Sequence, residues 1–219
     1  MRPLSLLESR VLGVLVEKAH AVPDSYPLSL NSLTLGCNQK TARDPVLNAS
    51  EADVQAALDA LKSMSLAFES SGSRVSRYEH NLGRALGLPS QSVALLGTLV
   101  LRGPQTVSEL RSNSERLHRF ADLSAVEGFL EELAARATEK GGPLVVRLPR
   151  APGSREARWA HLLGGPIDTS AMASAAEGEV FLPDTELLAL KARLAAMEAE
   201  VSRLGAIVTR LCADLDVKP

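Results

Sequence analysis

The chain contains the stretch VLGVLVEK at residues 11–18, and a similar stretch, LLGTLVLR, follows at residues 95–102. A second pattern also occurs twice, because the Ser-x-x-Ser-Leu of residues 29–33 returns as the Thr-x-x-Glu-Leu of residues 106–110. Similar segments that recur in the same order are the sequence signature of a repeated structural unit. The sequence therefore predicts one unit that is present twice.

Each copy is predicted to contain three helices. The apolar residues of segments 54–61 and 126–133 recur at every third or fourth position, which is typical of a helix with one buried face. In the first helix, the apolar positions Leu4, Leu7, Val11, Val14 and Leu15 are likewise expected on one face. Residues that cap helix N-termini precede the predicted helices, namely Ser5, Ser29 and Ser50 in the first copy and Ser90, Thr106 and either Asp122 or Ser124 in the second.

A short hairpin is predicted after the third helix of each copy. Its strands are expected near Ala67 and Val75 in the first copy and at residues 144–148 and 156–162 in the second. Three helices followed by a β-ribbon describe a winged helix, a variant of the helix-turn-helix module. The predicted fold class is mainly α with small β-hairpins (α+β), in the form of two tandem winged-helix domains followed by a C-terminal coiled-coil helix.

The predicted boundaries divide the chain into four parts. Winged-helix domain 1 covers residues 1–88, winged-helix domain 2 residues 89–163, a Gly-, Ala- and Ser-rich linker residues 164–183, and a coiled-coil helix residues 184–216. Each winged helix has only about 80 residues, so its packing against the other unit, or against a second chain, is expected to matter for stability.

Apolar residues alternate at spacings of three and four through the last segment. They are Leu187, Leu190, Leu194, Met197, Val201, Leu204, Val208 and Leu211. Heptads of this kind predict a coiled coil, and valine at a with leucine at d favours two strands. The hypothesis is a homodimer joined by this seam. The alternative is a helix that folds back on its own domain, since a single amphipathic stripe looks alike in both cases.

Charge and cysteine content indicate a cytoplasmic protein. The 219 residues carry a formal net charge of −2, divided into +2 over residues 1–165 and −4 over residues 166–219. Cys37 and Cys212 lie in different regions, which fits a reducing compartment. No charged-then-apolar leader precedes Ser5, and no apolar run reaches the roughly 20 residues of a membrane span. Neither secretion nor a membrane partner is expected.

Catalytic chemistry is not expected. The sequence contains no metal-binding His-x-x-x-His or Cys-x-x-Cys, no phosphate-cradling glycine loop and no nucleophile elbow. Its four histidines are widely separated, and Cys37 closes an apolar helix, where a buried structural thiol is the usual outcome. The chain is therefore expected to be no enzyme and to need neither a cofactor nor a metal.

The third helix of each copy is expected to be a poor surface for DNA. In a winged helix this element usually enters the major groove. Here its solvent side is rich in carboxylates, which repel phosphates. The side chains concerned are Glu51, Asp53, Gln55, Asp59 and Lys62 in the first copy and Glu127, Glu131, Glu132 and Arg136 in the second.

The hairpins, and the loop before the first copy's third helix, are basic instead. Candidate contacts with a nucleic acid or another partner are Arg74 and Arg77 in the first hairpin, Arg147, Arg150, Arg155 and Arg158 in the second, and Asn38, Gln39, Lys40 and Arg43 in the loop. Such a set could bind a phosphate backbone with little dependence on base sequence. Alternatively, the arginines are ordinary solvated side chains and the loop folds over its own domain, with its amides bonded to backbone.

Several short sequence motifs resemble those of one bacterial family. They are YPLSLN at residues 26–31, CNQKT at 37–41, RDPVLN at 43–48, RV at 74–75, RYE at 77–79, LRGPQT at 101–106, ELR at 109–111 and VVRL at 145–148. Together they resemble the YceH-type family of uncharacterised bacterial proteins over residues 4–163. The resemblance implies a tandem winged-helix fold, often with a helical C-terminal extension. It implies no activity, ligand or catalytic residue.

Two functional hypotheses follow. The first is a dimeric, non-catalytic adaptor or regulator that associates with duplex DNA through its basic hairpins and the loop at residues 38–49. The second is a protein-binding scaffold without DNA contact, which the acidic third helices favour.

The predicted seam can be tested by deletion. Removing residues 184–219 should halve the solution mass measured by light scattering, because the two strands of the coiled coil would be lost. A full-length chain that already runs as a monomer would contradict the dimer hypothesis.

Overall fold

The structure is a computed structural model that describes residues 2–70, 75–151 and 153–167, together with Met197 and Arg203. Apart from those last two residues, the expected coiled coil and its seam lie outside the described residues. Met197 is helical and 66% exposed. Residues 2–167 belong to a single compact unit, Met1–Ala176. The fold is a mixed α+β fold in which about half of the described residues are helical and the sheets are small and antiparallel.

The first repeat begins with three helices. They are α1 (Leu6–Ala21), α2 (Leu30–Cys37) and α3 (Glu51–Ser63). Three short strands form an antiparallel sheet in the order β1-β3-β2, with β1 at Leu28–Ser29, β2 at Ala67–Ser70 and β3 at Arg77–His80. The short helix α4 (Leu82–Leu86) leads into the second repeat, and a 3-10 turn, Pro23–Ser25, follows α1.

The second repeat follows the same order. Its helices are α5 (Ser90–Arg102), α6 (Val107–Ser114) and α7 (Leu123–Ala134), followed by a 3-10 turn at Thr138–Lys140 and the strands β4 (Val145–Arg147) and β5 (Trp159–His161). β4 and β5 pair antiparallel. Gln105 bridges to Trp159 through two backbone hydrogen bonds, in the place where β1 of the first repeat pairs with β3.

The helix starts follow the capping residues of the sequence. Ser5, Ser50 and Thr106 form complete capping boxes, and Ser29 and Asp122 accept hydrogen bonds from backbone N–H groups in the first turns of α2 and α7. These predictions are confirmed, with Asp122 rather than Ser124 as the cap of α7. Ser90 is the first residue of α5 instead of its cap.

Some elements differ from their predicted extents. The strands are shorter than predicted: the second strand of the first hairpin begins at Arg77, beyond Val75, and β4 and β5 have three residues each. The sequence did not predict α4, because five residues are too few to display a helical period.

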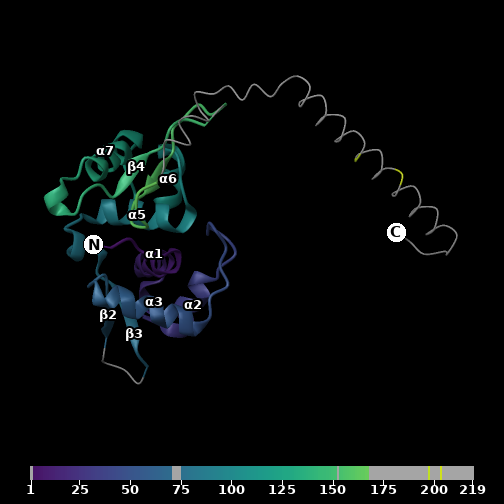
Figure 1. Cartoon of the computed structure of the whole chain (residues 1–219), viewed down its shortest axis with the longest axis vertical. Coiled ribbons are helices and arrows are strands. Elements are labelled where there is room, and N and C mark those ends of the chain that lie inside the picture. Colours follow the sequence, from purple (N-terminus) through teal and green to yellow (C-terminus); the bar gives the residue numbers. More distant parts are fainter. Residues whose placement is uncertain (1, 71–74, 152, 168–196, 198–202, 204–219) are drawn as a thin grey trace. The chain divides into compact units, whose positions relative to one another are not determined.

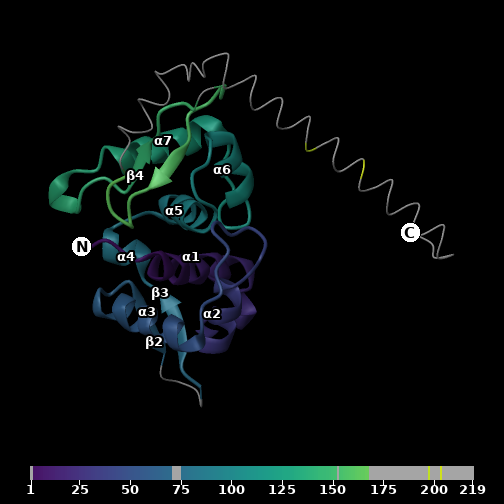
Figure 2. The ribbon, with the colours of Figure 1, turned by 45° about the vertical axis from the view of Figure 1, so that its right-hand side comes forward.

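The pair α1 and α5 lies at the centre of the described unit (Figures 1 and 2). Every residue of α1 from Glu8 to Val16, and every residue of α5 from Ser92 to Leu101, is buried. The sequence predicted one buried face on the first helix. The helix is buried on all sides because α1 packs on α2 and α3 of its own repeat and on α5 of the other.

Glycine permits the close approach of these two helices. A Cβ placed on Gly13 would lie 2.9 Å from Cγ1 of Val100, and a Cβ placed on Gly97 would lie 2.7 Å from Cγ1 of Val16. Gly13 and Gly97 hold equivalent positions in the two repeats, as do Val16 and Val100. Each repeat therefore offers the same glycine to the same valine of the other, which is the reciprocal contact of a two-fold interface.

One hydrophobic core runs through both repeats. It includes Leu15 and Leu58 of the first repeat, and Leu99 and Leu130 of the second, all without exposed surface. The predicted boundary between residues 88 and 89 therefore marks two sequence units that share a core, and their independence as domains stays a prediction.

The two hairpins lie on opposite sides of the α1–α5 pair. Figures 1 and 2 place the β2–β3 hairpin beyond one side of this pair and the β4–β5 hairpin beyond the other.

The glycine contact predicts opposite effects for the same substitution at two sites. Gly97→Ala should lower the free energy of unfolding by about 1–2 kcal/mol, because crowding against the stiff Val16 outweighs the gain in helix propensity. Gly128→Ala in α7, where a Cβ would meet nothing within 4 Å, should raise it by up to about 1 kcal/mol. Urea unfolding measures both values. Stabilisation by both substitutions would contradict the close contact.

Candidate functional site

Arg43, a candidate partner contact in the sequence, is buried. Its side chain has no exposed surface, and its guanidinium pairs with the Glu17 carboxylate, with 2.7 Å between Nη2 and Oε2 and 3.2 Å between Nη1 and Oε1. It also donates hydrogen bonds to the carbonyl oxygens of Gly36 and Ala42. Arg43 therefore fastens the loop to α1 and α2, and it is not a surface cation as the sequence suggested.

Arg10 is a second buried guanidinium in the same place. It is 1% exposed and donates to two carbonyl oxygens of the loop and its entry, at 3.1 Å to Cys37 and 2.6 Å to Pro45. Burial lowers its pKa, and the nearby charge of Arg43 lowers it further. The position of Arg10 directly before the apolar run VLGVLV of residues 11–16 was the sequence signal for this role.

The ion pair of Glu17 and Arg43 carries a pH dependence. Burial raises the pKa of Glu17, but the hydrogen bonds and charge of Arg43, helped by Lys18, outweigh burial and hold that pKa below its ordinary value. A lowered carboxyl pKa adds stability while the group is ionised. The contribution is therefore complete above the ordinary glutamate pKa and is lost as the pH falls through the lowered value.

The amides of the loop are engaged as well. The Asn38 side chain donates to the carbonyl of Ala49 and accepts from its N–H, both at 2.8 Å. Gln39 accepts a hydrogen bond from Arg43 and donates one to Thr41. Of the four candidate residues in the loop, Lys40 is the one that is exposed and makes no hydrogen bond or ion pair with a described residue. The loop folds over its own repeat, which is the second of the two alternatives.

The first hairpin offers one described candidate. Arg77 is exposed and donates to the carbonyl oxygen of Pro27 at 2.9 Å, whereas Arg74 lies outside the described residues. The second repeat repeats this bond, because Arg158 donates to the carbonyl oxygen of Pro104 at 2.8 Å. Arg158 also pairs with Glu109. Both arginines therefore tie their last strand to the segment before the second helix.

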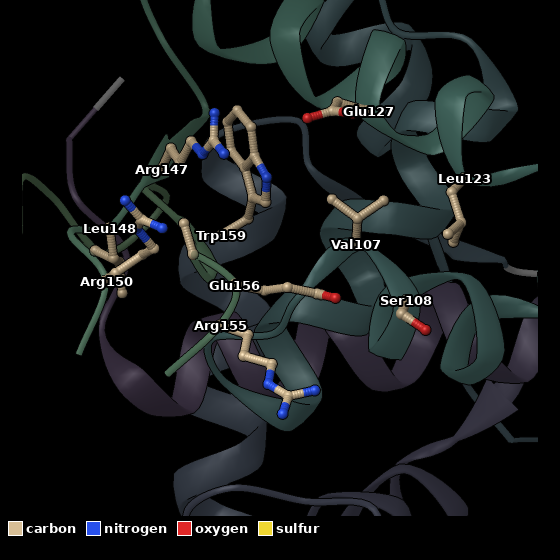
Figure 3. A pocket seen from close by; sticks show the side chains of 11 residues that line it. Val107, Ser108, Leu123, Glu127, Arg147, Leu148, Arg150, Arg155, Glu156 and Trp159 are labelled. Atoms are coloured by element: carbon tan, nitrogen blue, oxygen red, sulfur yellow. The ribbon is translucent and has the colours of Figure 1, made fainter. Parts of the chain in front are cut away.

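The three remaining arginines of the second hairpin line one cavity. Arg147, Arg150 and Arg155 are exposed, make no ion pair with a described carboxylate and border a cavity of about 670 Å³. In Figure 3 the hairpin residues form one wall. Residues of α6 and α7 form the other, and they are Val107, Ser108, Leu123 and Glu127. We call this space the wing cavity.

The wing cavity is electropositive at its rim. Besides the three arginines, the N-terminal ends of α6 and α7 border it, through Val107 and Leu123. Helix N-termini carry about half a positive charge each. Two carboxylates, Glu127 and Glu156, oppose this charge. Phosphate oxygens would find guanidinium donors along the hairpin wall.

The inner wall is apolar. Trp159 is 4% exposed and lies opposite Arg147 in the strand register. Trp159 belongs to the hydrophobic core and so anchors the hairpin. The sequence did not predict Val107, Leu123, Glu127 and Trp159 as neighbours, because they come from three elements that meet only in the folded chain.

The described residues at the equivalent place in the first repeat are arranged differently. Tyr78, the counterpart of Trp159, donates a hydrogen bond from its hydroxyl to Oε1 of Gln55 at 3.2 Å. Gln55 is the counterpart of Glu127, and this bond joins the two walls directly. Within the described residues, no hydrogen bond joins Trp159 to Glu127.

Burial shifts the pKa values of two titratable groups outside the wing cavity. Burial raises the pKa of Cys37 to about 12, so its thiol stays protonated. Burial, followed by the charge of His20, lowers the pKa of His80 to about 4. Among the described residues, no group of three or more His, Cys, Asp or Glu side chains could hold a metal ion. The described helices also include none with the length and apolar character that a bilayer span requires.

Comparison with known proteins places the chain beside an uncharacterised group. Residues 4–154 match the family described as "Protein of unknown function, DUF480". A UPF0502 protein of Burkholderia orbicola is 58% identical over 219 residues, which cover 99% of this chain and 91% of that protein. A UPF0502 protein of Methylibium petroleiphilum is 63% identical over 202 residues, which cover 92% and 85%. The resemblance to an uncharacterised bacterial family is confirmed.

The buried ion pair predicts that Arg43 contributes to stability. Arg43→Ala should lower the free energy of unfolding by about 3–5 kcal/mol, because it leaves Glu17 without its buried partner and releases the loop. Lys40→Ala, in the same loop but exposed, should change it by no more than about 0.5 kcal/mol. Chemical denaturation at neutral pH measures both. Equal, small effects would show that the loop does not depend on Arg43.

Proposed function

We propose that this chain, which belongs to the DUF480 (UPF0502) family of uncharacterised bacterial proteins, is a non-catalytic tandem winged-helix protein that binds the backbone of duplex DNA through its second hairpin. The convergence of Arg147, Arg150 and Arg155 on the wing cavity is the observation that carries the proposal.

The order of elements supports the winged-helix assignment. Each repeat has three helices followed by an antiparallel hairpin, and the segment before the second helix pairs with the last strand. Winged helices use the third helix or the hairpin to contact DNA. The assignment therefore directs attention to α7 and to the β4–β5 hairpin.

The charges favour the hairpin over the third helix. Glu131 and Glu132 on α7 are exposed, and carboxylates facing the major groove would repel phosphates. Arg147, Arg150 and Arg155 of the hairpin are exposed and have no carboxylate partner among the described residues, so they can replace counterions along a phosphate backbone. Such contacts position the protein and carry little base specificity.

In this proposal the first repeat does not contact DNA. Its Arg43 is buried and its Arg77 is bonded to Pro27, so fewer cations reach its surface than the sequence suggested. We assign DNA contact to the second repeat alone. A homodimer formed by residues 184–216, in a cytoplasmic protein, would present two such hairpins and strengthen binding through a higher effective concentration.

A protein-binding scaffold is the second candidate. Exposed apolar side chains support it, since Phe68 and Val75 in the first hairpin are 42% and 57% exposed. A scaffold would bind its partner through apolar contact and would be insensitive to salt. DNA binding through arginines has the opposite salt dependence.

Duplex binding measured against salt separates the two candidates. The wild-type chain should bind a random duplex at about 50 mM salt, with an affinity that falls steeply as salt rises. Replacing Arg147, Arg150 and Arg155 by alanine should reduce the slope of log affinity against log salt by about 2–3, since about 0.9 counterions are released per phosphate contact. Fluorescence anisotropy measures the slope.

The matched control removes three exposed cations elsewhere that have no carboxylate partner among the described residues, at Arg84, Arg116 and Lys140. This variant should keep the wild-type slope. No binding to random duplex at about 50 mM salt would rule out the proposal. If the salt slope fell equally in both triple variants, binding would depend on the overall charge of the protein and not on the wing cavity.

A further inference from the structure

The wing cavity offers more space than a backbone contact requires. A duplex presents its phosphates as a convex ridge, which a row of exposed arginines can bind without a recess. The wing cavity measures about 670 Å³, within the range of about 300–1,000 Å³ that encloses small organic ligands. The recess can therefore take a group that projects from the backbone.

The cavity has both cationic and apolar lining residues. Arg150 and Arg155 lie on the hairpin near its turn, at the rim. The apolar side chains Val107, Leu123 and Leu148 line the cavity as well, and Leu123 is 45% exposed. A ligand that matches both sides has an anionic group joined to a flat or apolar body.

Glu127 adds a hydrogen-bond acceptor to the apolar side. It lies on α7, one turn after Leu123, and Figure 3 shows it on the wall across from Arg147 and Trp159. It makes no ion pair with a described residue. A carboxylate in this position repels the anionic end of a ligand and accepts hydrogen bonds from an amino group at the other end.

We propose that the wing cavity binds one unstacked nucleotide, with its phosphate at Arg150 and Arg155 and its base against Val107 and Leu123. The inference rests on the proposed function and deepens it, because it names the form of nucleic acid that the hairpin prefers. Bases that leave the stack are read through their Watson–Crick edges, and carboxylates accept from the amino group of cytosine. Glu127 therefore favours a base with an exocyclic amino group, such as cytosine, over thymine.

Two sources could supply such a nucleotide. An unpaired residue in a duplex, such as a bulge or an overhang, brings a backbone that also meets the outer arginines. A free mononucleotide brings the same phosphate and base without that backbone. The duplex source is favoured because Arg147 lies further along the same wall, where a neighbouring phosphate can reach it.

Anisotropy titrations with three DNA probes and one competitor test the inference in the full-length chain. The probes are a fully paired DNA stem-loop, the same DNA with one unpaired cytosine, and the same DNA with one unpaired thymine. Cytidine monophosphate is the competitor. The unpaired cytosine should bind at least ten-fold more tightly than the paired probe, and more tightly than the unpaired thymine. Glu127→Gln should reduce the preference for cytosine over thymine at least five-fold.

Glu131→Gln is the matched control, because Glu131 is an exposed carboxylate one turn further along α7 and outside the cavity. It should keep the wild-type preference, and thermal melting should show both variants folded. A preference retained by Glu127→Gln would overturn the role of Glu127. Competition by micromolar cytidine monophosphate would support the cavity as a nucleotide site and assign it to the free nucleotide.

The outcomes distinguish this inference from the proposed function. Equal binding of the paired and unpaired probes, with an arginine-dependent salt slope, would overturn the nucleotide site and leave backbone binding intact. Absence of binding to all three duplex probes would overturn both.

Discussion

The contact between α1 and α5 is the constraint on which the rest of the structure depends. Both helices are buried along most of their length. If either repeat exposed its first helix to water, a large apolar surface would lose its burial. Gly13 and Gly97 allow the helix backbones to approach until each glycine meets a valine of the other repeat. The two repeats consequently share one core, and their equivalent surfaces face opposite directions.

This arrangement explains why equivalent elements have different tasks. The repeats keep the same internal bonds, of which the arginine-to-carbonyl bonds of Arg77 and Arg158 are an example. They differ where the last strand meets the third helix. Tyr78 and Gln55 join the two walls in the first repeat, whereas the larger indole of Trp159 and the carboxylate of Glu127 border an open cavity in the second. These two side-chain differences distinguish the walls of the cavity from the equivalent described residues of the first repeat.

Charge burial in the first repeat has a similar consequence. Arg10 and Arg43 bind carbonyl oxygens and one carboxylate inside the protein, where they fix the loop of residues 38–49 against α1, α2 and the end of α5. The guanidinium groups that hold this loop are removed from water. Each one needs hydrogen bonds to several acceptors, because these bonds offset the free-energy cost of desolvation. Their charge is therefore unavailable at the surface, whereas Arg147, Arg150 and Arg155 of the second hairpin are exposed and make no ion pair with a described carboxylate.

The sequence by itself determined the repeat, the family, the order of helices and hairpins, and the capped starts of most helices. These features are local: a capping box needs four residues, and a helical period needs two turns. The tertiary structure decided which charges are available. Arg43 and Arg150 look alike in the sequence, but one is buried by packing between elements far apart in the chain and the other is exposed at a cavity. Burial depends on which surfaces meet across the fold, and no spacing within one segment encodes that meeting.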